Sequence, residues 1–370
     1  MPNEDLIIVG ASARAACFSA RRAGFTPYWI DQFGDFDLQS EFTGQLVEPD
    51  SYPQGLVDCM KNTAELPFIY TGALESHLSV LEILEQQRPL LGNSTKVCRA
   101  IRNPQRLQDC YAAAGIAHPE VSRTTVETGS WLRKPLHGAG GRDIQSYQSK
   151  QEVGDDYYLQ GFIEGESRAG VFLGNGQEAC LIGVSRQLIG ETFLNAAAYA
   201  YCGSIGPLQI AEEERVQWQS IGSALTKNFS LKGLFCVDGI CRDGRIYPIE
   251  INPRYSASVE ILEPSLSFPL LLAHRQACEG ELPRALSRVS AMRAKAYLFA
   301  GDELRCPDDL NLIYSSSGAG TITADIPLPG SSIHKGYPLM TIIAEVENEM
   351  QAMSMLKSKV DLLYRQFDVE

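Results

Sequence analysis

Continuous apolar runs and helical apolar spacing divide the chain into short strands and helices. Near the N-terminus the pattern predicts a buried strand over 5–10, an Ala-rich helix over 11–23 and a second strand over 26–31. A strand, helix and strand in this order indicate a parallel βαβ unit of the doubly wound type. The loop at Gly10 lacks the third glycine of a dinucleotide-binding motif. We therefore interpret Gly10 as a turn that lets the helix pack on its strand, and keep a nicotinamide-dependent oxidoreductase only as a minor alternative.

The pattern changes twice along the rest of the chain. Helices are expected over 75–87 and 103–114, and after residue 291 short strands separated by Gly and Pro precede an amphipathic helix over 348–367. We expect an α/β protein, α+β in part, in three units. These are a doubly wound parallel-sheet domain over 1–95, a core over 96–288, and a small β-rich domain with a terminal helix over 289–370.

Composition narrows the class of protein. The 370 residues are 44% hydrophobic and 21% charged, with a net charge of −13, which is typical of a soluble protein and argues against nucleic acid or an anionic membrane as partner. No apolar run approaches the length of a membrane span, and the polar start is unlike a signal peptide. The ten cysteines contain no Cys-x-x-Cys pair. We expect reduced core cysteines and a cytoplasmic protein.

Oxygen-bearing side chains gather in a predicted hairpin over 233–254. Two apolar runs are joined by Asp243-Gly244, a strong turn signal. Asp238 lies on the first run, while Glu250 and Asn252 lie two residues apart on the second and share a face. Carboxylate and amide oxygens suit a hard cation such as Mg²⁺, with Mn²⁺ as a substitute.

The turn sets a condition on this metal site. A strict two-residue turn at Asp243-Gly244 would pair Asp238 with Ile249 and put Asp238 on the face opposite Glu250. Shared metal binding therefore predicts one extra residue in the turn, as in a three-residue loop with Gly244 left-handed in a bulge.

A strand followed by a glycine-rich loop forms a second element. The run Trp131-Leu-Arg-Lys-Pro delivers Lys134, and three glycines follow whose amides can approach phosphate oxygens without a Cβ in the way. They are Gly138, Gly140 and Gly141. The lysine precedes the glycines, so the element is not a P-loop.

Together these elements resemble the ATP-grasp superfamily of ligases. The resemblance covers Lys134 with its glycines, the segment Tyr157-Tyr-Leu-Gln-Gly-Phe-Ile-Glu-Gly-Glu166, and the "D…E-x-N-P-R" run from Asp238 to Arg254. It implies a two-subdomain ATP-grasp core, the first nucleotide-binding subdomain lying at about 122–190, and a Rossmann-like domain before the core. The C-terminal part is similar to that of biotin-carboxylase-like enzymes.

The resemblance also implies roles for individual residues. ATP would be bound by Lys134 at the phosphates, by the glycines closing over them, by Gln160, Phe162 and Ile163 at the adenine, and by Glu166 at the ribose. Mg²⁺ would be held by Asp238, Glu250 and Asn252, and Arg254 and Arg186 would act on the reacting groups. Relatives carry a phosphate-binding lysine where this chain has Arg102-Asn-Pro-Gln-Arg106, so either arginine is a candidate substitute.

The implied activity is ligation. ATP would activate a small carboxylate as an acyl phosphate, which a small amine then attacks, giving ADP and phosphate. An N-terminal similarity to ATP-grasp proteins grouped with methanofuran or methanopterin synthesis suggests an amino acid such as glutamate as a substrate. Two alternatives stay open: a bicarbonate- or formate-using carboxylase or purine-type enzyme, and a nucleotide-binding sensor or scaffold. A homodimer is one open arrangement.

Overall fold

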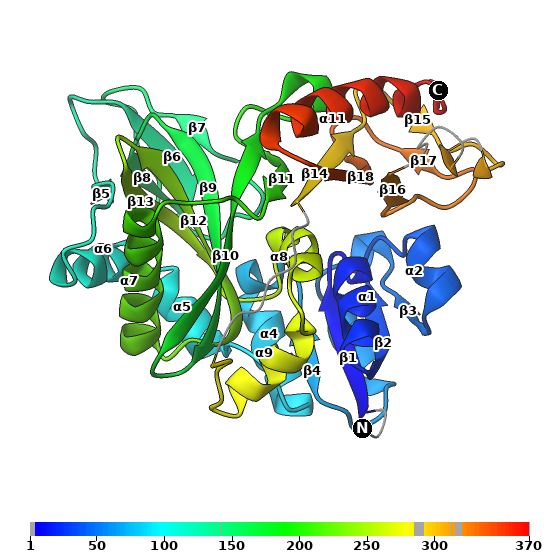
Figure 1. Cartoon of the computed structure of the whole chain (residues 1–370), viewed down its shortest axis with the longest axis horizontal. Helices are drawn as coiled ribbons and strands as arrows, with labels where there is room; N and C mark the ends of the chain where they lie inside the picture. Colours follow the sequence, from blue (N-terminus) through cyan, green and yellow to red (C-terminus); the bar gives the residue numbers. More distant parts are fainter. Residues whose placement is uncertain (1–3, 142, 285–291, 312, 315–319, 370) are drawn as a thin grey trace.

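The computed structural model describes residues 4–369 except 142, 285–291, 312 and 315–319. The predicted domain boundary at residue 288 therefore lies outside the described residues, and the division into three domains remains a prediction. The α/β fold class is confirmed by the arrangement that follows (Figure 1).

The N-terminal unit is a parallel sheet with strand order β3-β2-β1-β4. Its apolar strands are buried between helices, as continuous apolar runs predict. The strands are β1 (Glu4–Gly10), β2 (Phe25–Asp31), β3 (Gly44–Leu46) and β4 (Phe68–Tyr70). The helices are α1 (Arg14–Arg22), α2 (Phe36–Glu41), α3 (Gly55–Lys61) and α4 (Leu78–Gln87), with short 3₁₀ turns η1 (Pro49–Ser51) and η2 (Leu74–Ser76).

A large antiparallel sheet forms the centre of the molecule, with strand order β13-β12-β9-β10-β11-β14-β18-β16. Its C-terminal strands continue the same sheet, and the terminal helix covers them (Figure 1). The strands are β9 (Glu166–Asn175), β10 (Ala179–Ile189), β11 (Tyr201–Gly206), β12 (Lys232–Arg242), β13 (Arg245–Asn252), β14 (Met292–Phe299), β16 (Thr321–Ala324) and β18 (Pro338–Val346). The helices are α7 (Glu212–Phe229), α8 (Ala257–Leu262), α9 (Leu270–Cys278) and α11 (Glu349–Tyr364), with 3₁₀ turns η3 (Thr192–Leu194) and η4 (Glu263–Ser265).

Two small antiparallel sheets complete the described part. One, of order β5-β8-β6-β7, lies beside the β13 edge of the large sheet and follows helices α5 (Thr95–Ile101) and α6 (Pro104–Ala113). Its strands are β5 (Val121–Ser122), β6 (Trp131–Pro135), β7 (Gln145–Ser146) and β8 (Tyr157–Gly161). The other joins β15 (Leu304–Arg305), β17 (Ser332–Ile333) and β19 (Asp368–Val369).

Local signals explain why α5 and α6 begin where they do. The Ser94 hydroxyl accepts the backbone N–H of Val97, and Asn103 accepts that of Arg106, so each helix has a polar N-cap. Pro104 then occupies the first turn of α6, where no N–H is needed. These caps fix the start of α6 beside the glycine-rich loop.

One hydrophobic core joins the N-terminal unit to the large sheet. Leu6 and Ile8 of β1 share a buried cluster with Val171 of β9, Leu234 of β12 and Val259 of α8. Burial of large apolar side chains contributes about 1.5–3 kcal/mol each. The shared cluster therefore holds the N-terminal unit against the large sheet.

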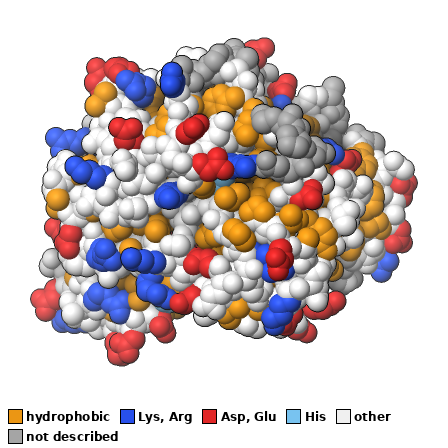
Figure 2. Space-filling model, turned by 90° about the horizontal axis from the view of Figure 1, so that it is seen from below, with side chains coloured by type: hydrophobic (Ala, Val, Ile, Leu, Met, Phe, Trp, Pro, Cys, Tyr) orange, Lys and Arg blue, Asp and Glu red, His pale blue; other side chains and the backbone are white. Residues whose placement is uncertain are grey.

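All ten cysteines are free thiols, six of them buried, which agrees with the expectation of reduced core residues. Among the described helices, none has the length and apolar character needed to cross a membrane. Seen from below, Figure 2 shows acidic and basic side chains scattered over the face, with several Lys and Arg side chains gathered at its left side.

Candidate functional site

The hairpin that carries the predicted metal ligands has a two-residue turn. Arg242 pairs directly with Arg245, and both Asp243 (φ 51°) and Gly244 (φ 74°) are left-handed. This is the backbone of a tight turn that Asp-Gly favours. The predicted three-residue loop is therefore wrong.

The extra residue lies instead within β13. Gly239 pairs with Pro248 and Asp238 pairs with Glu250, so Ile249 is left over as a β-bulge. Proline has no N–H to give to a ladder, which favours a bulge at its side. Asp238 and Glu250 consequently lie opposite one another, as the metal hypothesis requires.

The three predicted metal ligands form one cluster. The two carboxylate oxygens of Asp238 accept hydrogen bonds from Gln187 Nε2 and Asn252 Nδ2, each at 3.0 Å. Burial, and then the charge of Glu250, raise the pKa of Asp238 to about 7. Two ionised carboxylates this close repel each other, and a bound cation would remove that repulsion.

The donor set fits Mg²⁺ bound mainly through phosphate oxygens and water. Within the part of the chain that the structure describes, no group of three His, Cys, Asp or Glu side chains is spaced to hold a metal by itself. Magnesium commonly takes only one or two carboxylates from the protein. Asp238 and Glu250, with Asn252, match that requirement.

Arg254 is fixed by a carboxylate from the N-terminal unit. Its Nε and Nη2 donate to Glu75 Oε1 at 2.9 and 2.7 Å, and Nη2 also donates to Asn252 Oδ1 at 3.1 Å. Burial opposes the charge on Glu75, yet the attraction of Arg254 and Arg102 wins and lowers the pKa of Glu75. The arginine is thus aimed at the metal cluster from a rigid partner.

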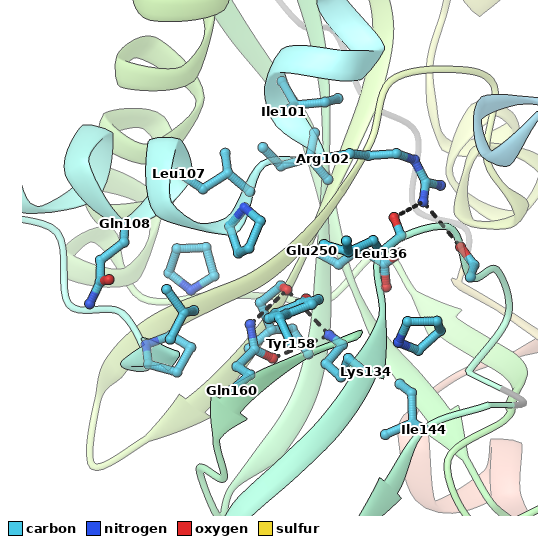
Figure 3. Close-up of a pocket in the computed structure, with 18 of the residues that line it drawn as sticks. Ile101, Arg102, Leu107, Gln108, Lys134, Leu136, Ile144, Tyr158, Gln160 and Glu250 are labelled. Carbon is cyan, nitrogen blue, oxygen red and sulfur yellow. Dashed lines mark hydrogen bonds between the residues drawn. The ribbon is translucent and has the colours of Figure 1, made fainter. Parts of the chain in front are cut away.

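A pocket that opens to solvent lies between the small sheet, α5, α6 and the end of β13. Figure 3 shows Lys134, Tyr158 and Gln160 together on one of its walls, close to Glu250. Lys134 Nζ donates to Gln160 Oε1 at 3.2 Å, and Gln160 Nε2 donates to the carbonyl of Ile249 at 3.2 Å. The bulge that aligns the carboxylates also turns its carbonyl toward this pocket.

Lys134 keeps its charge although it is 6% exposed. Burial lowers its pKa, but Tyr158, Glu250 and Asp238 attract the ammonium more strongly and raise the pKa above its usual value. A buried ammonium beside apolar walls is suited to neutralising phosphate charge.

The glycine-rich loop is held against the pocket from two sides. Ser76 Oγ and Arg102 Nη1 donate to the Gly138 carbonyl at 3.1 and 3.3 Å, and the Tyr201 N–H donates to the Gly140 carbonyl at 3.2 Å. Gly141 is left-handed (φ 77°), and a Cβ there would meet the Tyr199 carbonyl at 2.0 Å. Gly138 and Gly141 line the pocket, whereas Gly140 does not.

Of the two candidate arginines, the structure places Arg102 at the pocket. Its Nη1 donates to the Leu136 carbonyl at 3.2 Å, next to the Gly138 contact, as Figure 3 shows. Arg106 is exposed and lies over the Phe229 ring at 5.8 Å. Arg102 therefore organises the loop, and Arg106 is not part of the pocket wall.

The remaining predicted residues lie outside the pocket wall. Glu166 pairs with Arg168 at 2.6 Å and with Arg186 at 3.8 Å, and Arg186 also reaches Glu349 of α11 at 3.6 Å. At the hinge, Phe162 is 46% exposed and its N–H donates to the Ser130 carbonyl. Ile163, next to it, is half-buried. The roles of all four residues, which for Phe162 and Ile163 are backbone contacts to adenine, stay predictions.

Sequence reasoning missed three contributors. Glu75 is buried in a 3₁₀ turn after β4. Tyr158 on β8 attracts the Lys134 ammonium, and Ile249 contributes its backbone carbonyl. Pro248, which cannot donate to a strand ladder, was the available signal for the bulge. Nothing local marked Glu75, because its partner is 179 residues away.

Comparisons with known proteins agree with this geometry. Residues 105–258 match the model of the ATP-grasp domain. The chain is 22% identical to an uncharacterised protein of Methanocaldococcus jannaschii, over 93% of this chain and 88% of that protein.

Two solved structures have the same fold. One is the biotin carboxylase domain of Hydrogenobacter thermophilus 2-oxoglutarate carboxylase, in complex with MgADP, ADP and bicarbonate (TM-score 0.75, 15% identity, 99% of this chain and 90% of that chain). The other is the ADP complex of the N5-carboxyaminoimidazole ribonucleotide synthetase PurK (TM-score 0.73, 15% identity, 99% and 98%). For residues 105–258, the resemblance drawn from the motifs is confirmed by the match to the ATP-grasp domain.

Proposed function

Because this chain carries an ATP-grasp domain, we propose that it is an ATP-dependent ligase that joins a small carboxylate to an amine and forms ADP and phosphate. The observation that carries the proposal is that Lys134 of β6 and Glu250 of β13 line one pocket, while Asp238 lies opposite Glu250 and Arg254 binds Asn252 in the same hairpin region. Such convergence of charged side chains is what stabilisation of a phosphoryl-transfer transition state requires.

ATP and Mg²⁺ would supply the phosphoryl group and its charge neutralisation. Lys134 would bind phosphate oxygens, Gly138 and Gly141 would leave room for them, and Asp238, Glu250 and Asn252 would hold the cation. Arg254, fixed by Glu75, would orient the carboxylate substrate. Glu166 would bind the ribose and Arg186 an anionic substrate group.

We favour an amine as the group that accepts the activated acyl group. The carboxylate substrate would be an amino acid such as glutamate. A second candidate acid is bicarbonate, because one structure with the same fold was solved with that anion bound. The two acids predict different dependence of turnover on bicarbonate.

The test is phosphate release from MgATP with small acids and amines, singly and in pairs, in buffers with and without bicarbonate. Stimulation by one acid–amine pair with ADP as product supports the proposal. Asp238→Ala and Glu250→Ala should abolish turnover without unfolding the protein, while Asp243→Asn, on the exposed turn of the same hairpin, should leave it unchanged. Wild-type turnover in either alanine variant would refute the metal assignment.

A further inference from the structure

Four carboxylates lie together where the N-terminal unit meets the C-terminal strands. Asp31, Asp35 and Asp37 follow β2 at the carboxyl end of the parallel sheet, and Asp325 follows β16. Asp31 is 0% and Asp35 7% exposed. The carboxyl edge of an open parallel sheet is where such folds bind ligands.

Three of the four have partners. Asp31 accepts the N–H groups of Ala13 and Gly34, Asp37 accepts those of Asp325 and Ile326, and Asp325 accepts from Arg14 and Thr341. The fourth, Asp35, has a carboxylate oxygen without one among the described residues.

Asp35 Oδ2 is buried and has no hydrogen-bond partner in the described part of the molecule. An unpaired buried carboxylate oxygen costs several kcal/mol unless something fills the place. The carboxylates that raise the pKa of Asp35, after burial itself, are Asp325, Asp31 and Asp37, so Asp35 faces this cluster.

The nearby bases do not balance the acids. Arg14 and Lys295 both bind Glu260, Arg14 at 2.6 Å and Lys295 at 2.5 Å. Arg14 also pairs with Asp325 at 2.8 Å. Among the residues that the structure describes, two cations are therefore shared among five carboxylates, and a positive charge is missing there. Burial and the neighbouring acids raise the pKa of Asp31 to about 7, and burial raises that of Asp37 to about 6.

Two further unpaired atoms border the same edge. Glu75 Oε2 and the Tyr52 hydroxyl are buried without partners among the described residues. The Tyr52 hydroxyl is within electrostatic reach of Glu75, the partner of Arg254, and of Asp31 in the carboxylate cluster. On the other side, the Tyr201 and Tyr297 rings lie 5.8 Å apart, Tyr201 within electrostatic reach of Asp238 and Tyr297 within that of Asp325. The cluster therefore neighbours the site of the proposed ligation.

We propose that Asp31, Asp35, Asp37 and Asp325 form the subsite that binds the amine substrate through its primary ammonium group, with Asp35 Oδ2 as the acceptor awaiting a donor. That the bound amine is a substrate rests on the proposed function, whereas the binding of an ammonium group is argued from the four carboxylates themselves. An ammonium group offers three N–H donors that reach oxygens about 2.8 Å away. A bare metal ion fits this cluster less well, because no three His, Cys, Asp or Glu side chains among the described residues are spaced to hold a metal by themselves.

The test uses propylammonium chloride as probe, with KCl at the same ionic strength as reference. The thermal midpoint of the wild type should rise with propylammonium concentration relative to KCl, as ligand binding to the folded state requires. Asp35→Asn should weaken the apparent affinity at least tenfold. Asp325→Asn, which keeps a residue tolerant of the left-handed backbone (φ 51°), should do the same and decides the matter if Asp35→Asn does not fold. Asp58→Asn, an exposed carboxylate, is the control.

Equal midpoints in the two salts, or an unchanged response in the cluster variants, would overturn the inference. A parallel titration with MgADP separates the two proposals. Loss of the MgADP response with an intact ammonium response would reject the ATP site and leave this subsite standing. The reverse result would reject the subsite alone.

Discussion

Replacing Asp238 with Asn should make the metal-free protein more stable at alkaline pH and inactive at every pH. In the folded protein, burial and Glu250 raise the pKa of Asp238 from 3.8 to about 7. The proton therefore stabilises the folded state fully below pH 3.8, and this contribution is lost as the pH rises through 7.

The shift sets the size of the effect. Roughly three pKa units at 1.36 kcal/mol each give about 4 kcal/mol as an upper bound for the cost of the ionised Asp238. Asparagine carries no charge, but its amide nitrogen cannot accept from both Gln187 and Asn252, and losing one of those bonds costs about 1–2 kcal/mol. The net expectation is a gain of about 2 kcal/mol at pH 8 and a loss of about 1 kcal/mol at pH 4.

Urea unfolding in EDTA at both pH values measures this reversal, and MgATP turnover measures the loss of function. Asp243→Asn on the same hairpin should change neither. A variant less stable than wild type at pH 8, or one with the same difference at both pH values, would show that the two carboxylates do not repel each other as the structure implies.

Three further predictions follow from other buried groups. Glu75→Gln leaves the Arg254 guanidinium without its counter-charge, and should lower the free energy of unfolding in urea by about 3–5 kcal/mol; an unchanged value would contradict the buried pair. Lys134→Met should raise the KM for ATP roughly tenfold to a hundredfold, the worth of a charge-assisted contact, while exposed Lys232→Met should not. His274 accepts from the Leu234 N–H, and burial lowers its pKa to about 4; stability present above pH 6.5 should fall by about 3 kcal/mol towards pH 4, and His274→Gln should flatten that slope.

Periodic patterns predicted the elements better than their connections. The βαβ start, the position of Lys134 before its glycines and the hairpin at Asp243 all follow from local signals, and the structure has each of them. For the hairpin, the predicted facing of the side chains was correct, but the predicted position of the extra residue was wrong. The side chains of Asp238 and Glu250 share a face as expected, but Ile249 provides the extra residue, because a bulge can move along a strand while the turn chemistry stays fixed.

Contacts between distant segments were beyond the reach of the sequence. Glu75 and Arg254 meet only through the packing of β4 against the end of β13, and Asp325 joins Asp31 only because the C-terminal strands extend the large sheet. No spacing rule relates residues that the fold brings together from distant parts of the chain. A lone acidic residue in a loop carries no sign of such a partner.

The two hydrogen-bond donors to the Gly138 carbonyl have a consequence for the rate at which a bound nucleotide could leave. The glycine-rich loop could open only after three hydrogen bonds break. These are the bonds from Ser76 and Arg102 to the Gly138 carbonyl and the bond from Arg102 to the Leu136 carbonyl. At about 0.5–1.5 kcal/mol each, three such bonds would leave the open loop populated at roughly a few per cent or less. A bound nucleotide that leaves past this loop would then depend on that small open population. Ser76 and Arg102 would thereby slow nucleotide release through their hold on the loop.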